Sequence, residues 1–238
     1  WASALNAQYP ADSNNVVVAS QRGTNENILI IDPFLPMFDR ASGSLRLFQI
    51  VSILKRQGCH ITFIARNGQG QDRYADILRK MGVEVYATDP DNLGQMGYQV
   101  SARKVDIGSI LKSRNYQYAY LSFYSLALQY LFAIRKFSPQ TKILIDSVDI
   151  HFVREKRQAE LNGDAVLLER SKVTMEHEIF IYSKADAIIT VTEQDWNKVK
   201  PYLPDKAHFV IPNIHTVNEE ALTVDGRSGL LFIGNFSH

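Results

Sequence analysis

The stretch Ile28-Leu29-Ile30-Ile31-Asp32-Pro33 (ILIIDP) decides the fold of this chain of 238 residues. Four consecutive apolar residues that end at a polar turn are typical of a strand buried on both faces, as strands are in a parallel sheet. Pro33 and Pro36 each lack a backbone N–H, so we expect the strand to stop before them. A helical pattern follows between Ser42-Gly43-Ser44 and Gly58, with apolar residues at three- and four-residue steps.

Strands and helices alternate along the rest of the chain. We expect further strands at residues 60–65, 83–86, 116–121, 142–146, 186–191 and 208–211. Helices are expected at residues 74–81, 106–113, 126–137, 152–161, 164–183 and 193–200. This alternation predicts a Rossmann-like α/β fold, a doubly wound and mostly parallel sheet of about seven strands with helices on both faces. Such sheets bind ligands beyond the carboxyl ends of their strands, so residues that directly follow strands are the leading candidates for function.

Composition and charge limit the classes of function. Lys plus Arg number 26 and Asp plus Glu number 25, so the formal net charge is +1. A protein built to bind nucleic acid needs a clear cationic excess, and this sequence lacks one. A single cysteine, Cys59, excludes an internal disulfide and fits a reducing compartment. We therefore expect a cytoplasmic protein that does not bind nucleic acid, and contact with the inner face of the membrane stays open.

The chain is expected to have three segments. Residues 1–26 are polar and are interpreted as a tail or linker. Residues 27–215 are expected to form the Rossmann-like domain. Residues 216–238 begin with a polar stretch without a pattern and contain a fresh strand, Gly229–Gly234. A single strand cannot make a domain, so we expect an interdomain linker here and the first strand of a second domain that is absent from this chain.

The turn Ser42-Gly43-Ser44-Leu45-Arg46 follows the first strand and opens a helix. Free N–H groups at a helix start, together with the helix dipole, favour bound anions. Gly43 would let a ligand approach the backbone closely, and Arg46 could add a bidentate contact to a phosphate. Gly43, Ser44 and Arg46 are therefore candidates for substrate binding. The alternative, a plain Ser/Gly helix cap with a surface arginine, stays open at this point.

A second cluster, Asp146-Ser147-Val148-Asp149-Ile150-His151, follows the fifth strand. Two carboxylates and an imidazole at this place lie where sheets of this type carry function. His151 could hydrogen-bond a hydroxyl group or carry a proton, so His151 and Asp149 are candidate catalytic residues and Asp146 is a candidate substrate ligand. The alternative is that one of the two aspartates caps the next helix while His151 packs. The histidine spacing does not predict a metal site.

The remaining polar motifs have simpler interpretations. Gly68-Gln69-Gly70 fits a flexible loop, and the glycine fingerprints of dinucleotide and P-loop sites are absent from the sequence. The basic stretch Arg154–Arg157 could contact an acceptor phosphate or a membrane, but alternating charge on a helix is usually a solvated face. Glu176 and Glu178 are expected to face solvent on a long helix. Thr192 is expected to cap the last helix.

Four pieces of the sequence follow one another in a pattern shared with a known family. Asp32–Ala65 is similar to a proline-rich loop, small-residue turn, helix and G-H-x-V-T strand. Leu144–Leu161 is similar to D-x-V-D-x-H-x-x-R-E-x-R, and Glu176–Asp195 to a pattern that ends in A-D-x-x-I-x-V-(S/T). VIPNIH followed by GLLFIGNFSH is similar to the opening of a second domain. Together they resemble the N-terminal, acceptor-side half of a GT-B glycosyltransferase, closest to glycosyltransferase family 4.

The resemblance implies a twin-Rossmann enzyme with its active site in the cleft between two halves. Such enzymes move a sugar from a nucleotide-sugar donor to a saccharide or lipid-linked acceptor in polysaccharide or glycan biosynthesis, usually with retained configuration and without a required metal or other cofactor. The acceptor would lie mostly on this half. By position, Gly43 and Ser44 would lie near the donor phosphates or the transferred sugar. His151 would contact the sugar hydroxyls, and Asp149 would line the cleft.

One departure from the family pattern matters. The E-x7-E pair of the family belongs to the second domain, and no two Glu residues of this chain have that spacing. We therefore expect the chain to be inactive alone, because half a cleft cannot orient both substrates. The alternative is a non-catalytic Rossmann-like binding module of a larger assembly protein. A sugar-nucleotide epimerase or dehydrogenase would need a glycine fingerprint after the first strand, which is absent.

Overall fold

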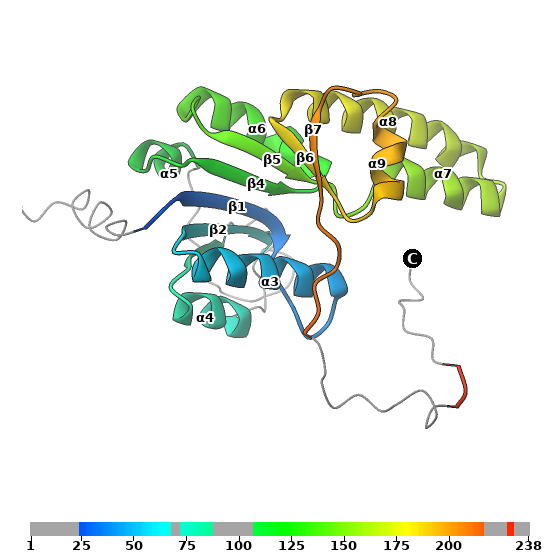
Figure 1. Ribbon diagram of the computed structural model, residues 1–238. Helices are drawn as coiled ribbons and strands as arrows, with labels where there is room; N and C mark the ends of the chain where they lie inside the picture. Colours follow the sequence, from blue (N-terminus) through cyan, green and yellow to red (C-terminus); the bar gives the residue numbers. More distant parts are fainter. Residues whose placement is uncertain (1–23, 68–71, 88–106, 217–227, 231–238) are drawn as a thin grey trace, which may run out of the picture.

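Parallel strands form one sheet of seven in the computed structural model of the protein, which describes residues 24–67, 72–87, 107–216 and 228–230. Their order across the sheet is β3-β2-β1-β4-β5-β6-β7 (Figure 1). The strands are β1 (Asn27–Phe34), β2 (His60–Asn67), β3 (Glu84–Ala87), β4 (Tyr118–Ser122), β5 (Lys142–Asp146), β6 (Ala187–Thr190) and β7 (Ala207–Val210). The helices are α3 (Ser42–Arg56), α4 (Asp72–Lys80), α5 (Ile107–Ser113), α6 (Tyr124–Phe137), α7 (His151–Asn162), α8 (Ala165–Lys184) and α9 (Glu193–Val199). The predicted fold class, a Rossmann-like doubly wound α/β sheet, is confirmed.

Helices cover both faces of the sheet. α3 and α4 lie on one face, and α5, α6 and α8 lie on the other (Figure 1). Side chains alternate along β1, so Ile28 and Ile30 pack with α3 and α4, whereas Leu29 and Ile31 pack with α6 and α8. Both faces of this central strand are buried, which explains why the run Ile28–Ile31 is continuously apolar.

The first strand is longer than the sequence predicts. β1 continues through Pro33 to Phe34, which pairs with Asn67 of β2. The pairing of β1 with β4 ends earlier, at Ile31 and Leu121. Pro33 therefore lies where one neighbouring strand has already ended, and its missing N–H removes no bond on that side. The prediction that the strand stops before Pro33 is wrong for this reason.

The predicted segment boundaries stay a prediction. Three parts of the prediction lie outside the described residues: the tail at residues 1–23, the loop Gly68-Gln69-Gly70, and most of the linker and second-domain strand expected at 216–238. Asn25 contacts the sheet domain, because its N–H donates to the backbone oxygen of Gly58 at 3.1 Å. After β7, Ile211 and Ile214 pack against the core that α3 covers. The described domain therefore extends along the chain slightly before its first strand, β1, and slightly after its last strand, β7.

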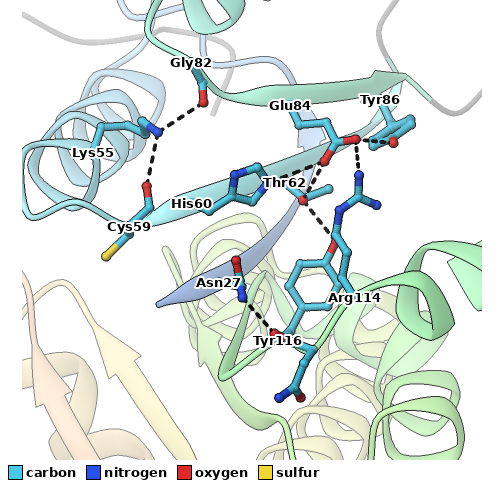
Figure 2. A network of polar contacts seen from close by, with 11 residues as sticks. Asn27, Lys55, Cys59, His60, Thr62, Gly82, Glu84, Tyr86, Arg114 and Tyr116 are labelled. Carbon is cyan, nitrogen blue, oxygen red and sulfur yellow. Dashed lines mark hydrogen bonds and ion pairs between the residues drawn. The ribbon is translucent and has the colours of Figure 1, made fainter. Parts of the chain in front are cut away.

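A polar cluster joins the amino ends of β2 and β3 to the segment before β4 (Figure 2). The carboxylate of Glu84 on β3 accepts hydrogen bonds from Thr62, Tyr86 and Arg114. Burial works to raise the pKa of Glu84, but the His60 imidazole 3.6 Å from its carboxylate, the hydrogen bonds from Tyr86 and Thr62, and the charge of Arg114 outweigh it and hold the pKa below its ordinary value. The cluster therefore stabilises the fold through an ionised carboxylate.

The Glu84→Gln variant should be less stable than the wild type by about 1–3 kcal/mol at neutral pH, because the charge-assisted hydrogen bonds of the carboxylate are lost. The lowered pKa sets the sign of the pH dependence. The stabilisation is complete above pH 4.5, the ordinary value, and disappears as the pH falls through the lower folded-state value. Urea unfolding at neutral pH and at about pH 3 measures both effects.

Glu169→Gln is the matched control, because Glu169 and Lys172 form an exposed pair on α8. This substitution should change the free energy of unfolding by less than about 0.5 kcal/mol. Equal losses for the two variants would contradict the role of the Glu84 cluster.

Candidate functional site

Two of the predicted site residues meet in the interior. The guanidinium of Arg46 on α3 donates to both carboxylate oxygens of Asp146, at the end of β5, at 2.5 and 3.3 Å. Tyr120 also donates to Asp146, and Nε of Arg46 donates to the backbone oxygen of Ile211 at 2.9 Å. Arg46 and Asp146 are each 1 % exposed. The alternative of a surface arginine is therefore wrong, because Arg46 is one half of a buried ion pair. Contact of either residue with substrate stays a prediction that requires the pair to open.

The first turn of α3 has no side-chain cap. Ala41 occupies the N-cap position, so the Ser/Gly cap considered for this turn does not form. The first N–H groups of the helix therefore keep their capacity to bind an anion. Gly43 and Ser44 are half-buried in this turn. A Cβ atom on Gly43 would lie 3.6 Å from Cγ1 of Val148, so the start of α3 adjoins the turn that follows β5.

The N-terminus of α7 is filled by a carboxylate from another helix. Glu178 of α8 is fully buried and accepts hydrogen bonds from the backbone N–H groups of His151 and Phe152, at 3.1 and 2.9 Å. Ile150 occupies the N-cap position, and neither aspartate of the preceding turn caps this helix. One expectation and one alternative are corrected here: Glu178 does not face solvent, and the cap of α7 comes from α8 and not from Asp146 or Asp149. Glu178 therefore takes the place that a bound anion would need.

The imidazole of His151 is oriented by its surroundings. Its Nδ1 lies 3.2 Å from the backbone oxygen of Asp149 and 3.6 Å from Oε1 of Glu178. The rings of Phe123 and Tyr124 meet the imidazole edge to face, with centroids 5.7 and 5.0 Å away. Two oxygen acceptors beside Nδ1 favour the tautomer that carries its proton there, which leaves Nε2 as an acceptor. His151 can therefore accept a hydrogen bond from a hydroxyl group.

Asp149 lies partly exposed at the start of α7 and forms an ion pair with Arg154. Lys156 pairs with Glu160 along the same helix at 3.8 Å. These contacts agree with the interpretation of Arg154–Arg157 as a solvated face. A substrate would meet Asp149 as a carboxylate that already has a cationic partner.

Asp32 joins the candidates once the strand order is known. It lies near the carboxyl end of β1, and the strand order reverses between β1 and β4, where doubly wound sheets bind ligands. Burial raises the pKa of Asp32 to about 6, in spite of the neighbouring Ser122 hydroxyl and a hydrogen bond from the Phe34 N–H, and the charge of Asp146 adds to the rise. The position of Asp32 directly after the first apolar run is the signal in the sequence that could have identified it.

Two strained backbone positions adjoin the same edge of the sheet. Phe123 directly follows β4 and has a φ of 64°, and Val148 follows β5 and has a φ of 54°. Positive φ is uncommon for residues with side chains and an outlier for β-branched valine. Phe123 contacts His151, and Val148 lies against Gly43. Strain of this kind concentrates at functional sites, so these turns support a site at the carboxyl edge.

The other features of the described residues do not indicate a second candidate site. A shallow hollow of about 250 Å³ lies at the amino ends of β4 and β5, lined among others by Asn115, Gln140 and Lys142, where sheets of this type do not bind ligands. Thr192 caps α9 as predicted and accepts from the Asp195 N–H at 3.1 Å. Within the part of the chain that the structure describes, no three His, Cys, Asp or Glu residues are grouped to hold a metal ion. No described helix is long and apolar enough to span a membrane.

Comparisons with known proteins give distant likenesses. No family model matches the sequence, and no curated protein matches it. Among solved structures, the chain is similar to sucrose-phosphate synthase from Thermosynechococcus elongatus, with 10 % identity and a TM-score of 0.49 over 79 % of this chain and 48 % of that one. It is also similar to BdcA from E. coli, with 11 % identity and a TM-score of 0.38 over 76 % of this chain and 90 % of that one. The chain thus spans about half the length of the synthase, and at this distance neither likeness decides a function.

Removing one partner of the buried ion pair should lower the free energy of unfolding more than replacing both partners with apolar residues. Asp146→Ala leaves the Arg46 charge buried without its carboxylate and should lower the free energy of unfolding by about 3–5 kcal/mol. The double variant Arg46→Met/Asp146→Leu should recover part of that loss, because apolar groups of similar volume need no partner, although the Tyr120 hydroxyl then has no carboxylate to donate to. Urea unfolding at neutral pH measures both. A double variant as unstable as Asp146→Ala would contradict this account of the pair.

Asp32→Asn should stabilise the protein in alkaline solution. The folded-state pKa of about 6 lies above the ordinary value of 3.8, so stability falls as the pH rises between these values and the ionised carboxyl is unfavourable above them. The variant should gain about 1–3 kcal/mol over the wild type at about pH 8 and nothing at about pH 4. Urea unfolding at both pH values is the measurement. A gain that does not depend on pH would show that burial does not perturb Asp32.

Proposed function

We propose that this chain is the acceptor-side half of a glycosyltransferase, which moves a sugar from a nucleotide-sugar donor to a saccharide or lipid-linked acceptor. One observation carries the proposal: the uncapped start of α3 adjoins the turn after β5, where Gly43 lies against Val148, close in sequence to His151. A place for an anion and an imidazole acceptor for a hydroxyl therefore share one edge of the sheet. The resemblance carried by Leu144–Leu161 supports the same function.

Each group would have its own task. Negative charge develops on the leaving diphosphate as its bond to the anomeric carbon breaks, and the N–H groups at the start of α3, beside Gly43 and Ser44, would stabilise that charge. His151 would accept a hydrogen bond from a hydroxyl of the transferred sugar through Nε2, beside Asp149 at the start of α7. Asp32, with a pKa of about 6, would exchange a proton with a hydroxyl group near neutral pH. The proposal needs no metal, because the helix start supplies the positive partial charge.

A second domain would complete the site. The resemblance assigns the carboxylate pair that holds the donor to a domain outside these 238 residues. One edge of one sheet cannot close over two substrates, and orientation and exclusion of water supply much of catalysis. We therefore propose that this chain alone does not turn over, whereas a protein with both halves transfers sugar in polysaccharide or glycan biosynthesis in the cytoplasm.

A non-catalytic binding module is the second candidate. It is favoured by the internal pairing of charged groups at this edge, Arg46 with Asp146 and Asp149 with Arg154. Such a module would bind a saccharide without releasing a nucleotide. The gene sequence after the codon for His238 separates the two candidates, because a second Rossmann-like half with an E-x7-E pair favours the enzyme and an early stop codon favours the module.

The deciding experiment uses the protein encoded by the complete gene. The protein is titrated with a panel of nucleotide sugars in the presence of an acceptor extract, and release of the free nucleoside diphosphate is measured. Release that needs both one particular donor and the acceptor supports the transferase. Saccharide binding without nucleotide release across the whole panel would support the binding module instead.

Gly43→Leu in that protein should lower turnover at least about 100-fold, because the larger side chain would keep a phosphate away from the start of α3. Gly43→Ala is the matched control, since its Cβ would make an ordinary contact with Val148 at 3.6 Å, and it should keep most of the activity. Thermal unfolding verifies that both variants fold. Turnover by Gly43→Leu at the wild-type rate would refute the assignment of the anion site.

A further inference from the structure

The surface over the last turns of α5, α6 and α8 exposes aromatic rings among lysines. Phe132 of α6 and Phe180 of α8 are 52 % and 47 % exposed, and their ring centroids lie 6.4 Å apart. Lys112, Lys136 and Lys184 come from the last turns of the same three helices and are exposed. We call these five residues the aromatic–lysine surface. Two large rings packed against each other in contact with water mark a place where another molecule can be bound.

Each lysine of the surface lies beside an aromatic ring. Nζ of Lys184 lies 5.2 Å from the centroid of the Phe180 ring. Nζ of Lys112 and of Lys136 lie 4.9 and 5.3 Å from the centroid of Phe137, at the end of α6. These cation–π contacts keep the ammonium groups at the level of the rings, with their alkyl stems along apolar surface.

Charged groups of both signs surround the surface. Arg135 and Lys142 both bind Asp186, and Nζ of Lys206 donates to two backbone oxygens at the end of α8. The acidic groups nearby are Asp186, Glu176 one turn before the exposed ring of α8, Asp205 next to Lys206, and Glu26, which lines a hollow together with Lys142. Cations near helix C-termini follow from the helix dipole and do not by themselves indicate a ligand. The dipole does not explain the exposed rings between them.

We propose that the aromatic–lysine surface binds an anionic lipid bilayer. The rings and the lysine stems would enter the boundary between headgroups and acyl chains, while the ammonium groups reach the lipid phosphates. An acidic polypeptide could pair with the lysines but would leave the two Phe rings in water. A bilayer interface takes up both kinds of group at once, so the combination favours lipid.

This binding goes beyond the proposed sugar transfer and uses a different end of the molecule. α6 and α8 end just before β5 and β6 begin, so the aromatic–lysine surface lies at the amino edge of the sheet. The candidate site lies at the carboxyl edge. The surface is also separate from the basic stretch Arg154–Arg157, which lies on α7.

Sedimentation with vesicles tests the proposal. The chain is mixed with phosphatidylcholine vesicles that contain about 30 mol % phosphatidylglycerol at about 0.1 M salt, and with vesicles of phosphatidylcholine alone. Binding to the anionic vesicles should be at least about tenfold tighter and should weaken at about 0.5 M salt. Equal binding to both kinds of vesicle, or binding to neither, would overturn the proposal.

Paired variants locate the contact. One replaces the lysines of the surface and the other replaces its rings, and each should weaken binding at least about tenfold. These variants are Lys112→Gln/Lys136→Gln/Lys184→Gln and Phe132→Ser/Phe180→Ser. Their controls change similarly exposed residues elsewhere and should bind like the wild type: Lys80→Gln/Lys198→Gln/Lys200→Gln and Tyr202→Ser/Phe209→Ser. Thermal unfolding shows that all four fold, and controls that lose as much binding as the surface variants would refute the location.

A fluorescence variant separates lipid from an acidic protein partner. The emission of Phe132→Trp, after subtraction of the wild-type signal, should shift to the blue on anionic vesicles because the indole leaves water. It should not shift with polyglutamate at the same concentration of negative charge. An equal shift with polyglutamate would assign the surface to an acidic protein partner and reject the bilayer.

Discussion

The buried ion pair between Arg46 and Asp146 holds together parts of the chain that are far apart in sequence. It joins α3 to the end of β5, and Nε of the same arginine reaches the backbone of Ile211 after β7. A buried charge without its partner is strongly unfavourable, so each part stabilises the position of the others. Gly43 lies one turn before Arg46, and Val148 lies two residues after Asp146. The contact between these two turns at the carboxyl edge is therefore a consequence of the ion pair beneath them.

The N-termini of α3 and α7 both lie at this edge, but only that of α3 is available to a ligand. Glu178 gives its buried carboxylate to the N–H groups of α7, so that start is closed to a ligand. The start of α3 has an alanine at the N-cap and stays available. An anion bound there would meet no net negative charge from Asp146, because Arg46 neutralises it, whereas Asp32 adds a negative charge as the pH rises above its pKa of about 6. The neutralised Asp146 and the uncapped helix start therefore favour the same kind of ligand.

Local patterns of the sequence predicted the elements and the edge of the sheet that carries the site, but not the pairing of charges. The run Ile28–Ile31 needs only its own residues to indicate a buried strand. Arg46 has a partner 100 positions away, and an arginine in the second turn of a helix looks the same in sequence whether it is paired inside or exposed. Glu178 likewise becomes a helix cap only because α8 packs against α7. Whether each charged group is paired inside or exposed depends on partners that the tertiary fold brings together. The local sequence pattern does not indicate those partners.

The aromatic–lysine surface and the candidate site constrain each other, because they lie at opposite ends of the strands. The surface is formed where α6 and α8 end, just before β5 and β6, and the site follows the far end of β5. A strand of five residues spans roughly 16 Å, so a bilayer that contacts the ends of α6 and α8 leaves the site roughly that far from the headgroups. A single sugar attached directly to a lipid would stay at the headgroup level and would not reach it. A glycan of several sugars would, and the two proposals together therefore favour an acceptor whose growing end stands well away from the membrane.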